Sequence, residues 1–234
     1  ALFVVAIILS YSRTAWISVA AADVDYFIIL RRIKFRWLAL TTFVLVSGFF
    51  IFQNEIFEKL EKNRRESSTN FVDHLKSITN ISSDASNLER INRWQSAIRM
   101  FRERPVLGTG PGTYQFLYAP YQLSKEKTII STNAGDRGNA HSEYIGPLSE
   151  SGVFGMLSFI AIVACVIYTA IRVYRRCRNR KVRILSLVLM LGLVTYYVHG
   201  VLNNFLDSDK ASVPFWGFTA IIVALDIYYR RGSK

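Results

Sequence analysis

Cysteine is nearly absent from this sequence, which has only two in 234 residues. Cys165 lies in an apolar run and Cys177 in a basic one, so the long polar segment from residue 53 to 144 contains none. Without paired thiols, no disulfide braces that segment. Ligand spacings typical of metal sites are missing too, and we expect no metal and no other cofactor.

Charge is almost absent from five long apolar stretches, although 20% of all residues are charged. Arg13 and Asp226 are the exceptions within the stretches, which are Leu2–Ala22, Trp37–Phe52, Val153–Ile171, Ile184–Leu206 and Val213–Tyr229. A hydrocarbon core about 30 Å thick is crossed by roughly 20 helical residues. The sequence therefore predicts an all-α integral membrane protein with about five transmembrane helices.

The start of the chain lacks an initiator methionine, a basic segment and a signal-peptide cleavage pattern. The first apolar stretch has already begun at Leu2. We expect the chain to be the C-terminal part of a longer membrane protein.

Acidic residues are few: 17 Asp and Glu stand against 29 Lys and Arg, for a net charge of +12. Fourteen of the basic residues lie in three clusters, at residues 31–36, 172–183 and 230–234. With five spanning helices, all three clusters fall on one side of the membrane, which the positive-inside rule makes the cytoplasm. This placement argues against a nucleic-acid partner. Residues 53–144, with 13 basic and 11 acidic side chains, then lie outside.

The chain divides into three predicted parts. Residues 1–52 hold two transmembrane helices and a basic turn, residues 53–146 form a large external loop domain, and residues 147–234 hold three more transmembrane helices. Within the loop, an amphipathic helix is predicted over 88–104 and ends at Pro105. One apolar stripe follows its helical spacing, at Leu88, Ile91, Trp94, Ile98 and Phe101.

Two residues stand out as chemically active. Arg13 interrupts an apolar helix beside Ser12, and a charge at such depth usually faces a cavity or a partner, although an arginine near the interface can also reach the lipid headgroups. His141 lies on the external side, just before a membrane helix, where an imidazole can accept a proton from a hydroxyl. Glu143 and Glu150 are candidates to orient it, and Glu150 also suits a simple helix N-terminus.

Other polar residues have plainer alternatives. His199 lies within an apolar stretch and must face protein or a cavity. Asn203 and Asp207 follow it, and a simple polar turn explains them equally well. The glycine-rich stretch at residues 108–112 lacks the Lys-Ser/Thr of a phosphate-binding P-loop and is interpreted as a turn.

Three segments, taken together, resemble the O-antigen ligase family of bacterial envelope proteins. They are SRTAW from Ser12, ERINRWQSAIRMFRERPVLGTGPGTY from Glu89, and NAHSEYIGPLSESGVFG from Asn139. Their order matches the family pattern of Ser-Arg, Arg-x3-Trp with Pro-x2-Gly-x-Gly, and His-Ser followed by Glu-x-Gly-x2-Gly. The family includes O-antigen polymerases and protein O-oligosaccharyltransferases.

The resemblance implies a GT-C-like glycosyltransferase in the bacterial inner membrane, with its active site facing the periplasm. Such an enzyme moves a glycan from undecaprenyl diphosphate to an acceptor, with inversion and without a metal; in the ligases the acceptor is lipid A–core. On this basis Arg13 and Arg90 are expected to bind the diphosphate and His141 to act as base. Substrate contacts are expected from Arg93, Trp94, Glu150, Ser12, Asn203 and Asp207.

Two alternatives belong to other classes. A polysaccharide-lipid transporter would explain Arg13 and His199 as charges on a substrate path, and a structural membrane protein would need neither. The transporter does not account for a long external loop whose helix is flanked by arginines, and in a structural protein that loop would be incidental. Within the enzyme class, the residues do not distinguish a ligase from a polymerase or from a protein glycosylating enzyme.

Overall fold

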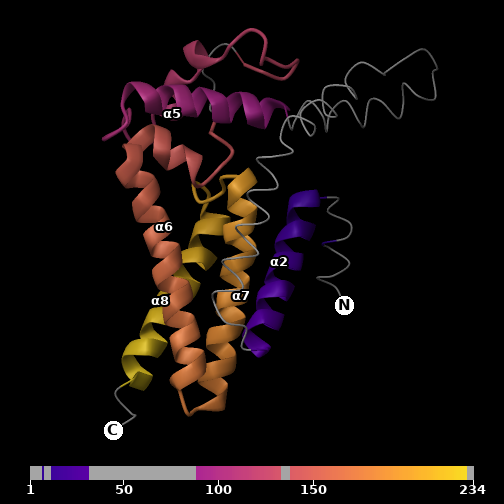
Figure 1. Ribbon diagram of the computed structural model, residues 1–234, viewed down its shortest axis with the longest axis vertical. Coiled ribbons are helices and arrows are strands. Elements are labelled where there is room, and N and C mark those ends of the chain that lie inside the picture. Colours follow the sequence, from indigo (N-terminus) through magenta and orange to yellow (C-terminus); the bar gives the residue numbers. More distant parts are fainter. Residues whose placement is uncertain (1–6, 8–11, 32–87, 133–137, 231–234) are drawn as a thin grey trace, which may run out of the picture.

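A computed structural model describes residue 7 and residues 12–31, 88–132 and 138–230 of the chain. All regular secondary structure in this part is helical (Figure 1). The long helices are α2 (Arg13–Leu30), α6 (Ile145–Arg176), α7 (Arg180–Leu202) and α8 (Asp209–Arg230). A further helix covers residues 88–103, and the short elements α5 (Tyr114–Leu117) and η1 (Ala119–Tyr121) follow it.

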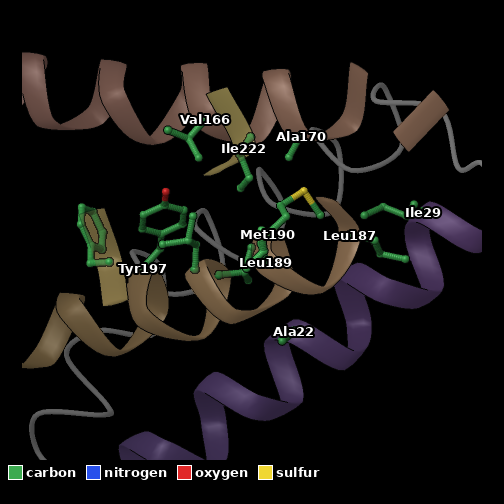
Figure 2. Close-up of a cluster of buried hydrophobic side chains, with 12 residues drawn as sticks. Ala22, Ile29, Val166, Ala170, Leu187, Leu189, Met190, Tyr197 and Ile222 are labelled. Atoms are coloured by element: carbon green, nitrogen blue, oxygen red, sulfur yellow. The ribbon is translucent and has the colours of Figure 1, made fainter. Parts of the chain in front are cut away.

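Three helices of the described part, α6, α7 and α8, are long and apolar enough to cross a membrane. α7 packs against α2, α6 and α8 and is the central helix of the bundle. In the most apolar 18-residue stretch of α7, 44% of the residues are buried, against 11% in the corresponding stretches of α6 and α8. α6 and α8 are therefore much less covered by the rest of the described protein than α7 is. Figure 2 shows the bundle core, in which Met190 and Tyr197 of α7 lie near Val166 of α6 and Ile222 of α8.

Helix α2 begins at Arg13. Ser12 has an extended conformation and caps α2, its Oγ accepting a hydrogen bond of 3.3 Å from the amide of Ala15. Serine is a common N-cap residue, because its oxygen satisfies a free amide of the first helical turn. Arg13 is thus the first residue of α2, within the predicted apolar stretch Leu2–Ala22, of which residues 2–6 and 8–11 lie outside the described residues. The second predicted span, Trp37–Phe52, lies outside the described residues.

A kink divides α6 near its start. Gly152 has φ +67° and ψ −160°, which is outside the helical region and open mainly to glycine. The short piece before the kink lies at the level of the polar segment, and the longer piece after it holds the apolar run predicted from Val153. The predicted domain boundary at residue 147 thus falls inside α6, two residues after its first residue, Ile145.

The polar segments form a layer over one end of the bundle, seen at the top of Figure 1. We call residues 88–132 and 138–144 the cap. Its small apolar core consists of Ala97, Met100, Tyr114, Tyr118 and Ala140. The opposite end of the bundle carries the α6–α7 turn and the end of α8, and we call it the basic end.

The buried face of the 88–103 helix differs from the predicted apolar stripe. All five stripe residues are only half-buried, whereas Glu89, Asn92, Arg93 and Ser96 are at most 8% exposed. The helix turns this polar face toward the rest of the cap because loop residues there provide hydrogen-bond partners. These hydrogen bonds offset the free-energy cost of burying polar groups. The stripe itself is left at the edge of the cap.

Candidate functional site

Two glycine-containing segments hold the cap on the bundle. The amides of Thr109 and Gly110 donate to the carbonyls of Ser149 and Glu150, at 3.1 and 2.8 Å, and the amide of Val153 donates to the Pro105 carbonyl at 2.8 Å. The kink at Gly152 releases these α6 groups from their helical partners. A Cβ atom at Gly108 or Gly152 would lie 2.3 Å from backbone atoms of the opposite segment, so both positions require glycine. The motifs Pro-x2-Gly-x-Gly and Glu-x-Gly-x2-Gly therefore form one joint.

Glu150 belongs to the same joint. Its two carboxylate oxygens accept hydrogen bonds of 2.9 Å from the amides of Gly112 and Tyr114. The carboxylate thereby fixes the glycine-rich turn that leads into α5. The structure places this candidate substrate contact against backbone amides of the cap.

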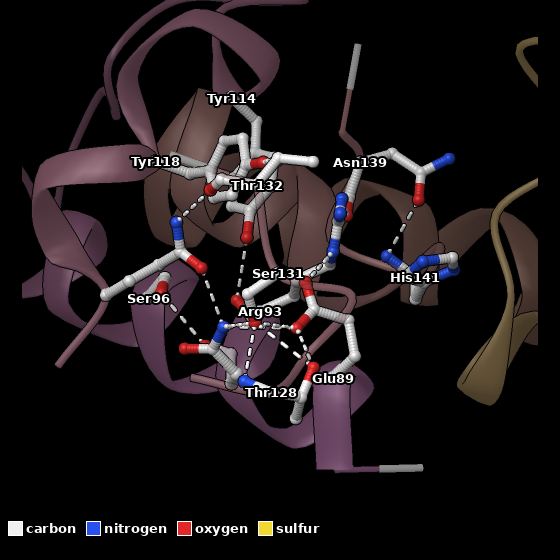
Figure 3. A network of polar contacts seen from close by, with 12 residues as sticks. Glu89, Arg93, Ser96, Tyr114, Tyr118, Thr128, Ser131, Thr132, Asn139 and His141 are labelled. Atoms are coloured by element: carbon white, nitrogen blue, oxygen red, sulfur yellow. Dashed lines mark hydrogen bonds and ion pairs between the residues drawn. The ribbon is translucent and has the colours of Figure 1, made fainter. Parts of the chain in front are cut away.

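A buried polar network fills the cap (Figure 3). Glu89 accepts a hydrogen bond of 2.8 Å from Arg93 Nε, and its other oxygen accepts bonds from the hydroxyls of Ser131 and Thr128. Burial alone would raise the pKa of Glu89, but the Ser131 hydroxyl and the Arg93 guanidinium together lower it, so the carboxylate is ionised. The network ties the 88–103 helix to the loop after η1.

Arg93 is held tightly inside this network. Its side chain forms the ion pair with Glu89, lies over the Tyr118 ring at 5.2 Å and donates through Nη1 to the Asn139 carbonyl at 3.2 Å. A Cβ at Gly138 would lie 2.3 Å from Nη1, so the chain passes directly over the guanidinium. Arg93, predicted as a substrate contact, therefore links the helix to the segment that carries His141.

His141 occupies a left-handed conformation, with φ +48°. Its amide donates to the Asn139 side-chain oxygen at 3.1 Å, and its carbonyl accepts a hydrogen bond from the Trp94 indole at 3.4 Å. Such a backbone is uncommon for a residue with a Cβ and persists only when its surroundings enforce it. Trp94, another predicted substrate contact, thus acts on the backbone of the histidine.

Burial, together with the charges of Arg93 and Arg90, lowers the pKa of His141 to about 4. The imidazole is therefore neutral at physiological pH and has a nitrogen lone pair available. Within the described residues, neither Glu143 nor Glu150 hydrogen-bonds the imidazole. Asn139 and Trp94 instead hold the main chain of His141.

Arg90 acts electrostatically on two imidazoles. The charge of its guanidinium is felt by His141 of the cap and by His199 of α7. The sequence predicted Arg90 and His141 as partners in one site, and that role stays a prediction. His199 had been noted only as a polar residue in a membrane helix.

A cavity of about 330 Å³ extends from His199 into the bundle. It lies between α2, α7 and α8, and its walls are mainly apolar, including Phe215 and Phe218 of α8. Ala15 and Ser18 of α2 also line it, so the start of α2 lies at the cap end, near His199. Arg13 therefore lies at the cap end of the bundle, although its side chain is outside what the structure describes.

Asn139 joins three parts of the site. Its carbonyl accepts from Arg93, its side-chain oxygen accepts from the His141 amide, and its side-chain nitrogen donates to Asn204 Oδ1 at 2.9 Å. Asn204 belongs to the turn between α7 and α8. Asn139 was not predicted as a site residue, because a polar residue two positions before a histidine does not by itself indicate hydrogen bonds to residues far away in the sequence.

Glu143 fastens the same turn. The residue is only 5% exposed. Its carboxylate accepts hydrogen bonds from the amides of Phe205 and Leu206, at 2.8 and 2.9 Å, and from the Tyr196 hydroxyl. Its amide donates to the Gly200 carbonyl at 2.8 Å. Burial raises the pKa of Glu143, although these hydrogen bonds oppose the shift.

The remaining predicted substrate contacts are Ser12, Asn203 and Asp207. Ser12 caps α2, as described above. Asn203 is buried in an extended conformation, and its amide donates to the His199 carbonyl at 3.1 Å. Asp207 is exposed on the turn between α7 and α8. No group of three or more His, Cys, Asp or Glu side chains that could hold a metal occurs within the described ranges.

No solved structure matches this chain. The teichuronic acid biosynthesis protein TuaE of Bacillus subtilis (strain 168) is 23% identical over 150 residues, which is 64% of this chain but 28% of that protein. The chain thus spans well under half the length of this curated relative. Residues 1–160 match the Wzy_C family, whose description is O-antigen ligase. Because that match covers more than half of its residues, the chain belongs to the O-antigen ligase (Wzy_C) family.

Proposed function

We propose that this chain belongs to a bacterial inner-membrane glycosyltransferase that uses an undecaprenyl-diphosphate-linked glycan as donor. The observation that carries the proposal is that the charge of Arg90 acts both on the buried His141 of the cap and on His199 of α7. A cation and a neutral imidazole suit a reaction whose leaving group is an anion anchored in lipid.

The transfer step is a direct displacement. The oxygen of the acceptor hydroxyl attacks the anomeric carbon, the bond from that carbon to the phosphate oxygen breaks, and the carbon is inverted. The hydroxyl proton passes to a nitrogen of the His141 imidazole, and undecaprenyl diphosphate leaves. General-base assistance of this kind contributes typically about 10²–10⁴-fold.

Arg90 and Arg13 bind the diphosphate in this scheme. Guanidinium groups suit phosphate because they donate two parallel hydrogen bonds. The bound diphosphate also opposes the positive charges that act on His141, so it raises the pKa of the imidazole from about 4 toward the range of an efficient base. Donor binding thereby prepares the base for the attack.

The cavity between α2, α7 and α8 accommodates the first part of the polyprenyl chain. Its apolar walls suit an isoprenoid, and it begins at His199, beside Arg90. The diphosphate then lies at the cap end, with Asn203, Asp207 and the α7–α8 turn bordering the sugar. This arrangement would place the cap in the periplasm and the basic end in the cytoplasm.

The acceptor distinguishes three candidate reactions within the enzyme class. Transfer to lipid A–core is the ligase reaction and is our first assignment. The similarity to a protein named for teichuronic acid biosynthesis favours a second candidate, polymerisation, in which the acceptor is another lipid-linked glycan. Transfer to a protein acceptor is the remaining alternative.

The test uses the purified full-length protein that contains this chain, with lipid-linked glycan as donor and each acceptor in turn. His141→Ala and Arg90→Gln should lower product formation by about 10²-fold or more while leaving membrane insertion intact. Arg102→Gln is the matched control, since Arg102 is exposed on the same helix. Near-native turnover in His141→Ala would refute the assignment of the base, and movement of the lipid without product would indicate a transporter.

A further inference from the structure

The basic end of the bundle contains a second cavity, which the proposed transfer reaction does not use. It measures about 170 Å³ and lies between the last turns of α6 and α8. Polar side chains that line it include Arg172 and Arg176 of α6 and Asp226 and Tyr229 of α8, with Cys177 at the end of α6. Both helices are candidate membrane spans, so the cavity lies at a membrane face.

Of the two arginines in the cavity, Arg172 is paired with an acidic residue. Arg172 forms a forked ion pair with Asp226, in which Nε donates to Oδ1 at 3.1 Å and Nη2 donates to Oδ2. The guanidinium also lies over the Tyr168 ring at 5.6 Å. This pair accounts for the single acidic residue in the last apolar stretch, and it fixes α6 to α8 at this level.

The second arginine leaves the cavity with a net positive charge. Arg176 is exposed and, among the residues that the structure describes, forms no ion pair. Nearby Arg183 is engaged differently: its Nε donates to the Tyr174 carbonyl at 2.9 Å and its guanidinium lies over the Tyr174 ring. Arg176 is therefore the cation of this cavity that remains for an anion.

Apolar and aromatic side chains also line the cavity. They are Val173 of α6 and Leu225 and Tyr229 of α8, and Tyr229 is 45% exposed. A recess that combines a cation with apolar walls at a membrane face matches an amphiphile with a phosphate head and acyl tails. Basic recesses between membrane helices on the side of the positive clusters bind anionic lipid headgroups in this manner.

We propose that this cavity binds the phosphate of an anionic phospholipid, with Arg176 as its main contact and Tyr229 at its rim, while the acyl chains lie along α8. The shared chemistry would also suit free phosphate. The apolar wall residues and the position at the end of two membrane spans favour the lipid. The proposal is independent of the transfer reaction assigned to the cap end.

Lipid binding is measured by native mass spectrometry on the purified full-length protein. The probes are phosphatidylglycerol, phosphatidylcholine with the same acyl chains, and inorganic phosphate. Phosphatidylglycerol should bind more tightly than phosphatidylcholine, and Arg176→Gln should weaken its first binding step by about fivefold, as expected for one basic residue near an anionic lipid. Arg176→Lys should retain most of the affinity.

Arg180→Gln is the matched control, because it removes the same charge from an exposed residue at the same end that does not line the cavity. Its binding of phosphatidylglycerol should equal that of the native protein. An equal loss in both variants would show diffuse attraction and overturn the site. Stabilisation by inorganic phosphate alone, abolished by Arg176→Gln, would assign the cavity to a soluble anion and overturn the lipid proposal.

Discussion

The cap and the bundle are held together by different kinds of contact. The buried side chains of the bundle core are aliphatic and aromatic, drawn from four helices. The cap buries few apolar residues but encloses Glu89, Asn92, Arg93, Ser96 and Gln122, which are joined by hydrogen bonds. Directed bonds fix positions more narrowly than apolar packing does, and the residues of the candidate site lie in or against the cap.

The difference follows from the surroundings of each region. In lipid, helices associate through close packing because the tails around them are as apolar as the side chains. A polar layer cannot rely on apolar area, and its buried charges are favourable only when every partner is present. The cap should therefore be sensitive to loss of single partners, and the bundle to loss of volume.

The largest expected effect comes from removing one partner of the buried ion pair. Glu89→Ala leaves the Arg93 guanidinium buried and unpaired, which costs about 3–5 kcal/mol. The measurement is the unfolding free energy in detergent, with protease sensitivity reporting on the cap. If the cap of this variant resisted protease as the native protein does, the polar network would not be what stabilises it.

The joint between the two glycine motifs should be next in sensitivity. Gly152→Ala forces a Cβ to within 2.3 Å of the Val106 backbone and a residue with a side chain into φ +67°, and such strain costs about 1–3 kcal/mol or more. Gly217→Ala is the control, because nothing lies within 4 Å of the added Cβ. Equal thermal midpoints for the two variants would contradict the joint.

Asn139 provides a smaller change that separates positioning from stability. Asn139→Ala removes two side-chain hydrogen bonds and should cost about 1–3 kcal/mol, with kcat falling more than donor KM rises, because His141 loses its backbone support. Asn139→Asp keeps the acceptor for the His141 amide and should recover much of kcat. A uniform loss in both variants would argue that Asn139 has only a general structural role.

A further expected effect is on the pH dependence of stability. The pKa of His141 is lowered from 6.5 to about 4, so the unfolded chain binds more protons than the folded protein between these values. Stability is therefore present above pH 6.5 and decreases as pH falls toward 4. His141→Gln should flatten this part of the profile of thermal midpoints, and an unchanged profile would exclude burial of a neutral imidazole.

The placement of each end can be tested by reporter fusions. A reporter after Arg178, at the basic end, should be active in the cytoplasm, and one after Asn80 should be active in the periplasm. The positive-inside rule and the site both require this orientation. The reverse pattern would remove the cap from the side on which lipid-linked glycans are used in the proposed reaction.

Several elements were predictable because their signals are local. The apolar runs beginning at Val153, Ile184 and Val213 correspond to α6, α7 and α8, and Pro105 follows the 88–103 helix closely. His141 was selected from its position before a membrane helix and Arg90 through the family resemblance, and their shared role stays a prediction. Charge-free length and motif order are properties that the sequence displays directly.

Other features depend on contacts between distant residues. The polar face of the 88–103 helix points inward only because Ser131 and Thr128, some forty positions later, complete the shell of Glu89. Helical periodicity favoured the apolar stripe, which remains half-buried. Asn139 and Glu143 owe their roles to the α7–α8 turn, more than sixty positions away.

The hydrogen bonds between Pro105–Gly110 and Ser149–Val153 also constrain the order in which the protein forms. The cap hydrogen-bonds main-chain groups of α6 that are free only where α6 bends. It is also hydrogen-bonded to the turn that follows α7. Its final shape must therefore await insertion of both helices during biosynthesis. A soluble fragment limited to the polar loop would lack the surface on which it matures.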